Sequence, residues 1–509
     1  MASVGGPDAF AAIWASTVDR QADAMFLVYE GPDGLVSRWT YGQFDEVVSR
    51  VAGTLVSNGV EPGSSVHMAL ANCPAFVAVW LAVIRLGAWV VTSDPMGGEV
   101  ELRGHIGRTG PVVGICAASR ADVYLSACGA LRVIEVEEQD SDLVAFDGDP
   151  IHFSTAPAPT DRAAVMFTSG TTGVPKGVEV TQANYAFAGR TMAAAAGLDE
   201  TDRQLVVLPL FHANAQYYSF ASSIWVGASV ALMSSFTASG FLGQAARHEA
   251  TTASLFAAPM RMILARGGPV DDLRLRHCWF AQNLAADQYE MISDWFGCRP
   301  RQLYGMTETM PAVLTDELRN PDHLSMGRVT EDCIVDVQRS DGTSVEVGEV
   351  GELVVGGQRG LTLFAGYLDD PETTEASFRN GWFLTGDRAK RDSTGRHYFD
   401  GRRSDVLKVA GENVSVVEVE AALADHEKVL EAAVVGRPDP VRDEVPVAFV
   451  VAADAADPPS TEELVAWCEG RLAKAKRPHE IWLIDELPRT SVGKIRKFLL
   501  ADRSNELED

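Results

Sequence analysis

The residues with the clearest chemical potential lie together in one short segment, residues 166–177, which reads MFTSGTTGVPKG. Glycine lets a backbone approach an anion closely, and serine and threonine add hydroxyl donors. Lys176 adds a point charge that suits phosphate. These residue types at this density predict a cradle for a polyphosphate.

This segment is not a Walker A loop, because the pattern GxxxxGK followed by Ser or Thr fits neither here nor at residues 493–494. A plain Ser/Thr/Gly-rich surface loop is the alternative interpretation. The segment directly follows an apolar strand, RAAVMFT, and that context favours a phosphate site.

The elements that must position this segment alternate along the chain up to about residue 400. PAFVAVWLAVIRLG (74–87) predicts a buried helix that Gly87 ends. The predicted strands are SSVHMAL (64–70), AWVVTS, PVVGIC, LRVIEV, RAAVMFT, LVVLPL and ASVALM. Continuous apolar strands that alternate with helices predict an α/β fold, with parallel or mixed sheets covered by helices.

The last hundred residues have a different pattern. DVLKVA, LEAAVV and VPVAFVVAA predict strands, and Ser415 with Glu418 and Ser460 with Glu463 predict capping boxes that open two helices. The second of these helices is expected over TEELVAWCEGRLAK. This pattern predicts a compact α+β unit, joined to the rest by the polar segment FDGRRSD (399–405).

Composition limits the class of protein. The 509 residues carry a net charge of −27, which argues against nucleic acid or an anionic membrane as the main partner. The seven cysteines are widely spaced, without a CxxC pair, and the start MASVGGPDAF has no signal-peptide pattern. We expect reduced thiols, no zinc site and a cytoplasmic location.

Seven motifs in a fixed order carry a resemblance to a known family. They are TSGTTGVPKG (168–177), LPLFHAN (208–214), YGMTET (304–309), GELVVGG (351–357), FLTGD (383–387), GRRSDVLKVAGENVS (401–415) and LPRTSVGKIRK (487–497). The chain resembles the adenylate-forming superfamily of acyl-CoA synthetases, luciferases and nonribosomal adenylation domains. The resemblance implies a large ATP- and acyl-binding domain (1–403) and a small mobile α+β domain (404–509).

The resemblance also implies the phosphate and metal contacts. The β- and γ-phosphates of ATP are expected at Thr168, Ser169, Gly170, Thr171, Thr172, Gly173 and Lys176. Thr307 matches the α-phosphate contact and Glu308 the Mg²⁺ ligand, which agrees with the preference of Mg²⁺ for oxygen ligands.

The rest of the nucleotide site follows in the same way. Tyr304 is expected to stack on the adenine, Gln302 to meet its amino group, and Gly305 and Met306 to complete the segment. Ala281, Gln282 and Asn283 occupy the place of a Gly-rich adenine-side segment, from which this sequence departs. Asp387 and Arg402 match the residues that hold the ribose hydroxyls.

Two further residues are implied for the chemistry. Lys494 matches the catalytic lysine, a cation that stabilises charge on the α-phosphate and on the departing pyrophosphate. His212 matches an aromatic position at the carboxylate pocket, and we expect it to gate or position the acyl group.

Within the superfamily, AQNL (281–284), GENVSVVEVE (411–420) and PDPVRDEVPVAFVV (438–451) resemble the crotonobetaine/carnitine-CoA ligase-like group. Arg442, Lys476 and Arg477 are expected to pair with CoA phosphates. The hinge position, commonly Asp or Lys, is Ser404 here, followed by Asp405. A small residue can absorb the backbone rotation that a hinge requires.

Three functions remain open from the sequence. The first is an acyl-CoA synthetase that uses ATP, Mg²⁺ and CoA to convert a carboxylic acid to a thioester through acyl-AMP. The second is an adenylating enzyme that loads a carrier protein in trans. The third is a nucleotide sensor without turnover, against which Lys494 and Glu308 both count. PLFHANAQ has no Asp to hold an α-amine, which favours an acid other than an amino acid.

Overall fold

The computed structural model describes residues 8–153, 156–168, 175–402, 406–409, 412–439, 442–489 and 495–506. It divides into two compact units: Met1–Val335 with Val355–Phe383, and Asp336–Val354 with Leu384–Asp509. The predicted hinge at Ser404 lies outside the described residues, so the boundary between residues 403 and 404 stays a prediction.

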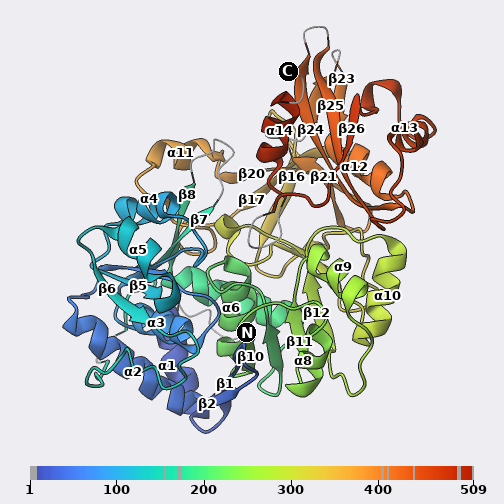
Figure 1. Cartoon of the computed structure of the whole chain (residues 1–509). Coiled ribbons are helices and arrows are strands. Elements are labelled where there is room, and N and C mark those ends of the chain that lie inside the picture. The colour runs from blue at the N-terminus through green and yellow to red at the C-terminus, as the bar shows by residue number, and fades with distance from the viewer. Residues whose placement is uncertain are drawn as a thin grey trace. The chain divides into compact units, whose positions relative to one another are not determined.

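Two large sheets build the first unit (Figure 1). Within the described residues one sheet has seven strands, in the order β18 (Gly366–Tyr367), β8 (Lys176–Thr181), β7 (Arg162–Thr168), β4 (Trp89–Thr92), β3 (Ser65–Ala69), β5 (Val113–Ala117) and β6 (Arg132–Val136). The strands from β7 to β6 are parallel, and β8 and β18 close the edge as antiparallel strands.

The second sheet of this unit has nine strands in the described part of the chain. Their order is β15 (Arg328–Val329), β14 (Leu314–Thr315), β13 (Arg301–Tyr304), β12 (His277–Phe280), β11 (Thr252–Ser254), β9 (Arg203–Val206), β10 (Ser229–Met233), β1 (Met25–Glu30) and β2 (Val36–Thr40). The strands from β13 to β1 are parallel, with antiparallel strands at both edges.

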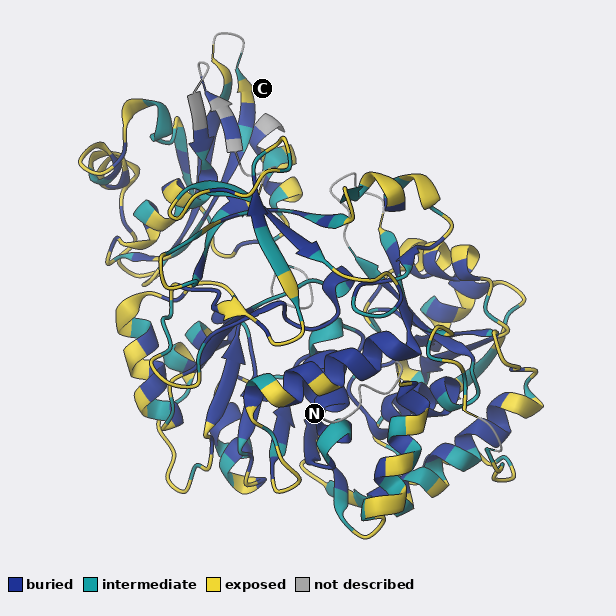
Figure 2. Ribbon diagram, turned by 180° about the vertical axis from the view of Figure 1, so that it is seen from behind, coloured by how far each residue is buried: buried dark blue, intermediate teal, exposed yellow. Residues whose placement is uncertain are grey.

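Helices cover both faces of each sheet, as the strand pattern predicted. One hydrophobic core joins the two sheets through α1 (Phe10–Gln21), α2 (Tyr41–Ser57), α3 (Pro74–Arg85), α6 (Gln182–Ala196) and the π-helix η2 (Asn214–Ala221). Separate cores lie under α4 (Glu99–Thr109) with α5 (Ala121–Cys128), and under α8 (Phe241–Arg247), α9 (Ala257–Arg266) and α10 (Ala286–Phe296). The short helices are η1 (Ala118–Arg120), α7 (Ser222–Val226), η3 (Thr307–Thr309) and α11 (Pro371–Ala376). Figure 2 shows how much of this unit is buried.

The predicted helix over 74–87 is confirmed as α3, which begins with Pro74 and is buried over 74–84. Gly87 follows it at φ +68°, where glycine is favoured. Helix α6 comes very close to η2, because a Cβ on Gly189 would lie 2.6 Å from the carbonyl oxygen of Ala221. Only glycine permits that approach.

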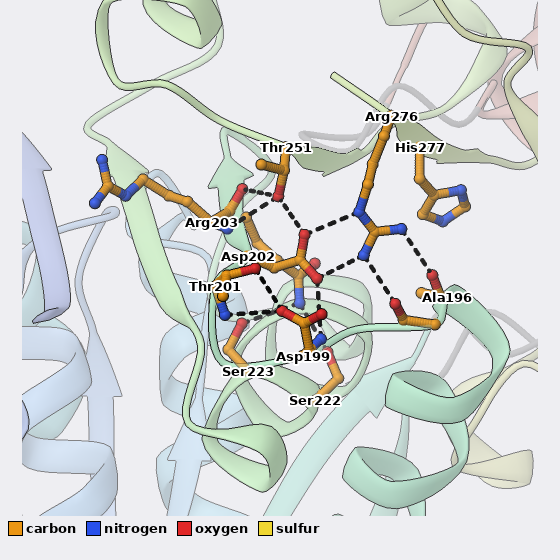
Figure 3. A network of polar contacts seen from close by, with 12 residues as sticks. Ala196, Asp199, Thr201, Asp202, Arg203, Ser222, Ser223, Thr251, Arg276 and His277 are labelled. Carbon is orange, nitrogen blue, oxygen red and sulfur yellow. Dashed lines mark hydrogen bonds and ion pairs between the residues drawn. The ribbon is translucent and has the colours of Figure 1, made fainter. Parts of the chain in front are cut away.

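A buried carboxylate holds the end of α6 in place (Figure 3). Asp202 accepts hydrogen bonds from Thr251 Oγ1 at 2.7 Å and from Arg276 Nε at 3.0 Å. Arg276 also donates to the carbonyl oxygens of Ala196 and Gly197, at the carboxyl end of the helix. The network therefore joins α6 to the amino ends of β9, β11 and β12.

The second unit contains a five-stranded sheet among its described residues, in the order β23 (Glu412–Ser415), β22 (Val406–Val409), β25 (Asp443–Ala452) and β24 (Val429–Asp439), with β26 (Glu480–Leu483) beside β25. The helices of this unit are α12 (Val416–Ala424), α13 (Thr461–Glu469), η5 (Lys474–Lys476) and α14 (Lys497–Glu506). A further sheet consists of β16 (Ile334–Gln338), β17 (Val350–Gly356), β20 (Trp382–Arg391), β19 (Phe378–Arg379) and β21 (His397–Arg402). The division between the units falls within β16, β17 and β20.

The two predicted capping boxes have different outcomes. Ser460 and Glu463 form one at the start of α13, although the helix ends at Glu469 rather than continuing to residue 474. The box predicted at Ser415 is wrong, because the Ser415 side chain makes no cap hydrogen bond. The Glu418 carboxylate instead accepts two hydrogen bonds at 2.7 Å from Lys476, and a full charge is the stronger partner.

No helix in the described ranges combines the length and the hydropathy that crossing a membrane requires.

Candidate active site

Three predicted segments begin at one edge of the nine-stranded sheet. The strands β9, β12 and β13 are parallel members of it, and their carboxyl ends lead into residues 208–212, 281–283 and 305–309. Carboxyl ends of parallel strands share an edge, which is where open α/β sheets bind ligands. The sheet therefore gathers the segments of His212, Gln282 and Glu308 from three distant parts of the chain.

A strained turn shapes the segment of Thr307 and Glu308. Thr309 is fully buried; its Oγ1 accepts from the backbone nitrogen of Met306 at 2.9 Å and donates to the Met306 carbonyl at 3.1 Å. Met310 follows at φ +69°, a conformation unusual for a residue with a side chain. The turn fixes the backbone of Glu308 just after the end of β13.

Glu308 and Lys176 meet at a common neighbour, Tyr367. The Tyr367 hydroxyl donates to Glu308 Oε1 at 3.0 Å, and the Lys176 ammonium lies 4.8 Å from the centre of the Tyr367 ring. Burial, and then the nearby Glu308 carboxylate, raise the pKa of Tyr367, so its hydroxyl remains a donor. The predicted metal ligand, Glu308, thus contacts the Tyr367 hydroxyl, and the predicted phosphate lysine, Lys176, lies against the Tyr367 ring.

Backbone pairing explains this meeting. Lys176 pairs with Thr168 across β7 and β8, and Tyr367 pairs with Val178 across β18 and β8. The backbone nitrogen of Phe364 also donates to the Glu308 carbonyl at 2.9 Å. Residues 364–367 therefore connect the end of the seven-stranded sheet to the turn that carries Glu308.

A second tyrosine, Tyr217 of η2, packs beside the end of β7 from inside the core. Its hydroxyl lies 3.7 Å from Met166 Sδ, two residues before Thr168. Burial raises the pKa of Tyr217 well above its usual value, and the Glu308 carboxylate adds to that effect. Tyr217 therefore remains neutral.

The segment that carries His212 is fixed by buried amides. Asn72 donates to the Leu208 carbonyl at 3.1 Å and accepts from the Leu210 nitrogen at 2.8 Å. Gln216 Nε2 donates to the Leu210 carbonyl at 2.7 Å. His212 is half-buried, with its ring centre 4.2 Å from that of Phe211.

The segment 281–283 keeps a backbone that glycine would favour. Gln282 lies at φ +75° and is exposed, as is Asn283, whereas Ala281 is half-buried. The side-chain nitrogen of the buried Gln302 donates to Asn283 Oδ1 at 2.9 Å and to the His323 carbonyl. These bonds orient Gln302 and tie it to the predicted adenine-side segment.

Tyr304, the last residue of β13, is half-buried, and Gly305 follows it at a tightly packed position. A Cβ on Gly305 would lie 2.7 Å from the Tyr218 hydroxyl and 3.0 Å from the Pro311 carbonyl oxygen. Glycine is therefore required there for a packing reason.

The predicted ribose residues lie in the second unit. Asp387 and Arg402 are paired across β20 and β21, and Arg402 Nε donates to Asp387 Oδ1 at 3.0 Å. Asp387 is buried, and its backbone nitrogen donates to Thr385 Oγ1 at 3.1 Å. The two residues are brought together as an ion pair on neighbouring strands.

The residues predicted for CoA have partners within the second unit. Lys476 is paired with Glu418, and Arg477 donates to the Leu472 and Glu469 carbonyls at the carboxyl end of α13. The Arg442 backbone nitrogen donates to Asp439 at 2.8 Å, and its side chain is exposed. The structure gives Lys476 and Arg477 roles in holding the unit together, and their CoA roles stay predictions.

Five predicted phosphate residues, 169–173, and Lys494 lie outside the described residues. Their roles stay predictions too.

A pocket of about 510 Å³ in the first unit is not part of this site. It is lined by Gly87, Trp89 and Arg162, which lie at the amino ends of β4 and β7, opposite Thr168.

Tyr367 and Tyr217 are the site residues that sequence reasoning missed. Neither lies in a motif: the pairing of β18 with β8 brings Tyr367 to Glu308, and the packing of η2 brings Tyr217 to Met166. The sequence signal for Tyr367 was its context, FAGY, which is followed after three residues by the helix start PETTEA.

Comparison with known proteins agrees with this geometry. Residues 14–368 match the AMP-binding enzyme family, and residues 418–494 match the AMP-binding enzyme C-terminal domain. The chain is 31% identical to the crotonobetaine/carnitine–CoA ligase of Salmonella arizonae, over 95% of this chain and 97% of that ligase.

Solved structures are similar over nearly the whole chain. O-succinylbenzoate coenzyme A synthetase of Bacillus subtilis, in complex with AMP, is 28% identical with a TM-score of 0.84, over 96% of this chain and 97% of that one. A benzoate CoA ligase of Burkholderia xenovorans is 25% identical with a TM-score of 0.87, over 97% of this chain and 100% of that one.

Proposed function

This chain belongs to the AMP-binding enzyme family, and we propose that it is an AMP-forming acid–CoA ligase acting in two steps. In the first step a carboxylate oxygen attacks the α-phosphorus of ATP, and the bond to the leaving pyrophosphate breaks. In the second step the CoA sulfur attacks the acyl carbon of acyl-AMP; a thioester forms, AMP leaves, and the thiol proton passes to solvent.

The observation that supports this proposal most is the meeting of Lys176 and Glu308 at Tyr367. A cation for phosphate, at the start of β8, and a carboxylate for a metal ion, just after β13, therefore both contact the side chain of Tyr367. Positioning and electrostatic stabilisation are what phosphoryl-type chemistry asks of a protein.

The donor set suits Mg²⁺. Mg²⁺ is commonly bound by one or two carboxylates together with substrate phosphates and water, and Glu308 supplies one buried carboxylate. Tyr367 holds Oε1 of that carboxylate by a hydrogen bond, which fixes the orientation of the group. Bound Mg²⁺ would neutralise charge on the phosphates, while Lys176 attracts their oxygens and Thr307 donates to the α-phosphate.

The remaining predicted residues complete the reaction. Asp387 accepts from the ribose hydroxyls, with Arg402 beside it. Lys494 stabilises the charge that develops during pyrophosphate departure, and His212 borders the carboxylate pocket. The relatives are named for crotonobetaine or carnitine, benzoate and O-succinylbenzoate, so we propose a small organic acid as the substrate. We propose CoA rather than a carrier protein as the acceptor, because these relatives are CoA enzymes by name.

A panel of small carboxylic acids with ATP and Mg²⁺ tests the proposal. Pyrophosphate release without a thiol, followed by CoA-thioester on addition of CoA, is the expected result. Turnover only with a phosphopantetheinylated carrier would replace CoA as the acceptor, and nucleotide binding without pyrophosphate release for any acid would contradict the proposal.

Lys494→Ala separates the two steps. We expect acyl-AMP formation to fall about 10²–10⁴-fold, the usual effect of removing one charge-stabilising group. The variant should still convert a supplied acyl-adenylate to thioester. Lys497→Ala is a matched control, because Lys497 forms an ion pair with Glu420 at 2.8 Å within the second unit. Equal loss in both steps of Lys494→Ala would refute its assignment.

A further inference from the structure

Helix α4 contacts the residues next to both Thr168 and Lys176, which pair across β7 and β8. Phe167 precedes Thr168 in β7, and Pro175 directly precedes Lys176, the first residue of β8. His105 contacts Phe167, and Arg108 contacts Pro175. Neither residue belongs to a motif that the proposed function uses.

The contact at His105 is a flat stack. The imidazole and the Phe167 ring have centres 3.9 Å apart and planes 4° apart. His105 is 6% exposed, and burial, together with the charge of Arg108, lowers the pKa of His105 to about 4. At neutral pH the ring is therefore uncharged and packs as an aromatic surface.

A buried hydrogen-bond chain fixes that imidazole. His105 Nδ1 lies 2.8 Å from Ser93 Oγ, which lies 2.9 Å from His67 Nε2. His67 Nδ1 lies 2.6 Å from the Tyr124 hydroxyl. Every residue of this chain is buried. The chain connects α4 to β3, to the end of β4 and to α5, and it holds the His105 ring in position against Phe167.

Arg108 contacts the residue before β8 as well as β7. Its guanidinium donates to the Pro175 carbonyl at 2.6 Å and lies 5.1 Å from the centre of the Phe167 ring. Arg108 therefore contacts the residue before Lys176 and the residue before Thr168 at once. The next residue after Pro175 is Lys176, whose ammonium lies against Tyr367.

We propose that α4 positions the phosphate-binding end of the β7–β8 pair, with Arg108 and His105 as positioning residues for Lys176 and Thr168. The proposal rests on the proposed function, since it assumes that Lys176 meets ATP. Neither residue touches the nucleotide; His105 acts through Phe167, and Arg108 acts through Pro175 and Phe167.

Arg108→Ala is the principal test, because Arg108 is exposed and its truncation leaves the core intact. We expect the KM for Mg-ATP in pyrophosphate release to rise about fivefold to twentyfold, as for loss of one charge-assisted hydrogen bond. The KM for the acid, and thioester formation from a supplied acyl-adenylate, should change less than about twofold. Arg108→Lys should recover part of the loss, because an ammonium can still donate to the Pro175 carbonyl.

Arg103→Ala is the matched control on the same helix. Arg103 is exposed and pairs with Glu99 and the Ser126 carbonyl, away from β7 and β8. It should leave the KM for Mg-ATP unchanged. His105→Phe should keep the stack and stay within about threefold of the original KM, whereas His105→Ala should resemble Arg108→Ala.

Direct binding of Mg-ATP, measured by calorimetry on the full chain, separates the two proposals. If the original protein binds no Mg-ATP, the proposed function fails. If it binds Mg-ATP and Arg108→Ala binds equally well, the role of α4 is refuted. Equal decline of both half-reactions in Arg108→Ala would also overturn it, because that is the effect of a general loss of structure.

Discussion

At the scale of the residue, Tyr367 has two separate tasks. Its hydroxyl holds a carboxylate oxygen of Glu308, and its ring lies beside the ammonium of Lys176. The two tasks use different parts of the side chain, so they can be separated by substitution.

Tyr367→Phe keeps the ring and removes the hydroxyl. We expect kcat/KM for Mg-ATP to fall about 10- to 150-fold, because a buried carboxylate loses a hydrogen bond worth roughly 1.5–3 kcal/mol. The Mg²⁺ concentration needed for half-maximal rate should rise with it. Pyrophosphate release measured against both ATP and Mg²⁺ checks this result.

Tyr289→Phe is the control. The Tyr289 hydroxyl is also buried, but it donates to the Pro300 carbonyl, just before β13. Normal Mg²⁺ dependence in Tyr367→Phe would show that the hydroxyl does not position the metal ligand.

At the scale of the element, the buried chain under α4 makes stability depend on pH. Burial lowers the pKa of His67 to about 3 and that of His105 to about 4. In the unfolded chain each imidazole titrates near a pKa of about 6.5. Between these values the unfolded chain binds more protons, so stability falls as pH falls, and it is flat above the unfolded pKa.

We therefore predict that the first unit loses roughly 1–2 kcal/mol of stability for each imidazole between about pH 7 and about pH 5. Urea unfolding followed by tryptophan fluorescence at both pH values measures this loss. His105→Phe should remove the contribution of His105, while His67 and the buried His248 and His277, whose pKa values burial also lowers, retain theirs. His152→Gln, at an exposed position, serves as the surface control. A slope in His105→Phe equal to that of the original protein would contradict the interpretation.

Capping shows how far an element can be predicted. Ser415 and Ser460 precede equivalent patterns, yet only Ser460 makes the reciprocal bonds with its Glu. Lys476, which is distant in the sequence, takes the carboxylate of Glu418. Local signals located both helix starts, and a tertiary ion pair decided which side chain formed the cap.

At the scale of the whole molecule, the proposed reaction needs Lys494 in the first step and space for a thiol in the second. The family resemblance implies that the small domain turns between these steps, at or near Ser404. Pro has a fixed φ and cannot take part in a large backbone rotation.

Ser404→Pro should therefore form acyl-AMP at the normal rate and form thioester more slowly, by about tenfold or more if the rotation becomes limiting. Pyrophosphate release and CoA-thioester appearance, followed in one preparation, check the prediction. Ser404→Ala, which keeps the backbone free, is the control. Unchanged thioester formation in Ser404→Pro would move the hinge to Arg403 or Asp405.

The sequence by itself determined the family, the alternation of strands and helices and the segments that carry the chemistry, because these depend on local residue types and their spacing. It placed Glu308 and Asp387 in motifs, and Gln302 two residues before one, without showing their neighbours. Gln282 illustrates the limit: the sequence lacks the expected glycine, yet the backbone keeps the left-handed conformation at φ +75°.

Only the tertiary structure decided which side chains meet. Tyr367 reaches Glu308 because β18 pairs with β8, and Arg108 reaches Pro175 because α4 covers the seven-stranded sheet. Contacts between residues more than 50 positions apart depend on strand order and helix packing across the whole unit, and no local pattern in the chain carries that information.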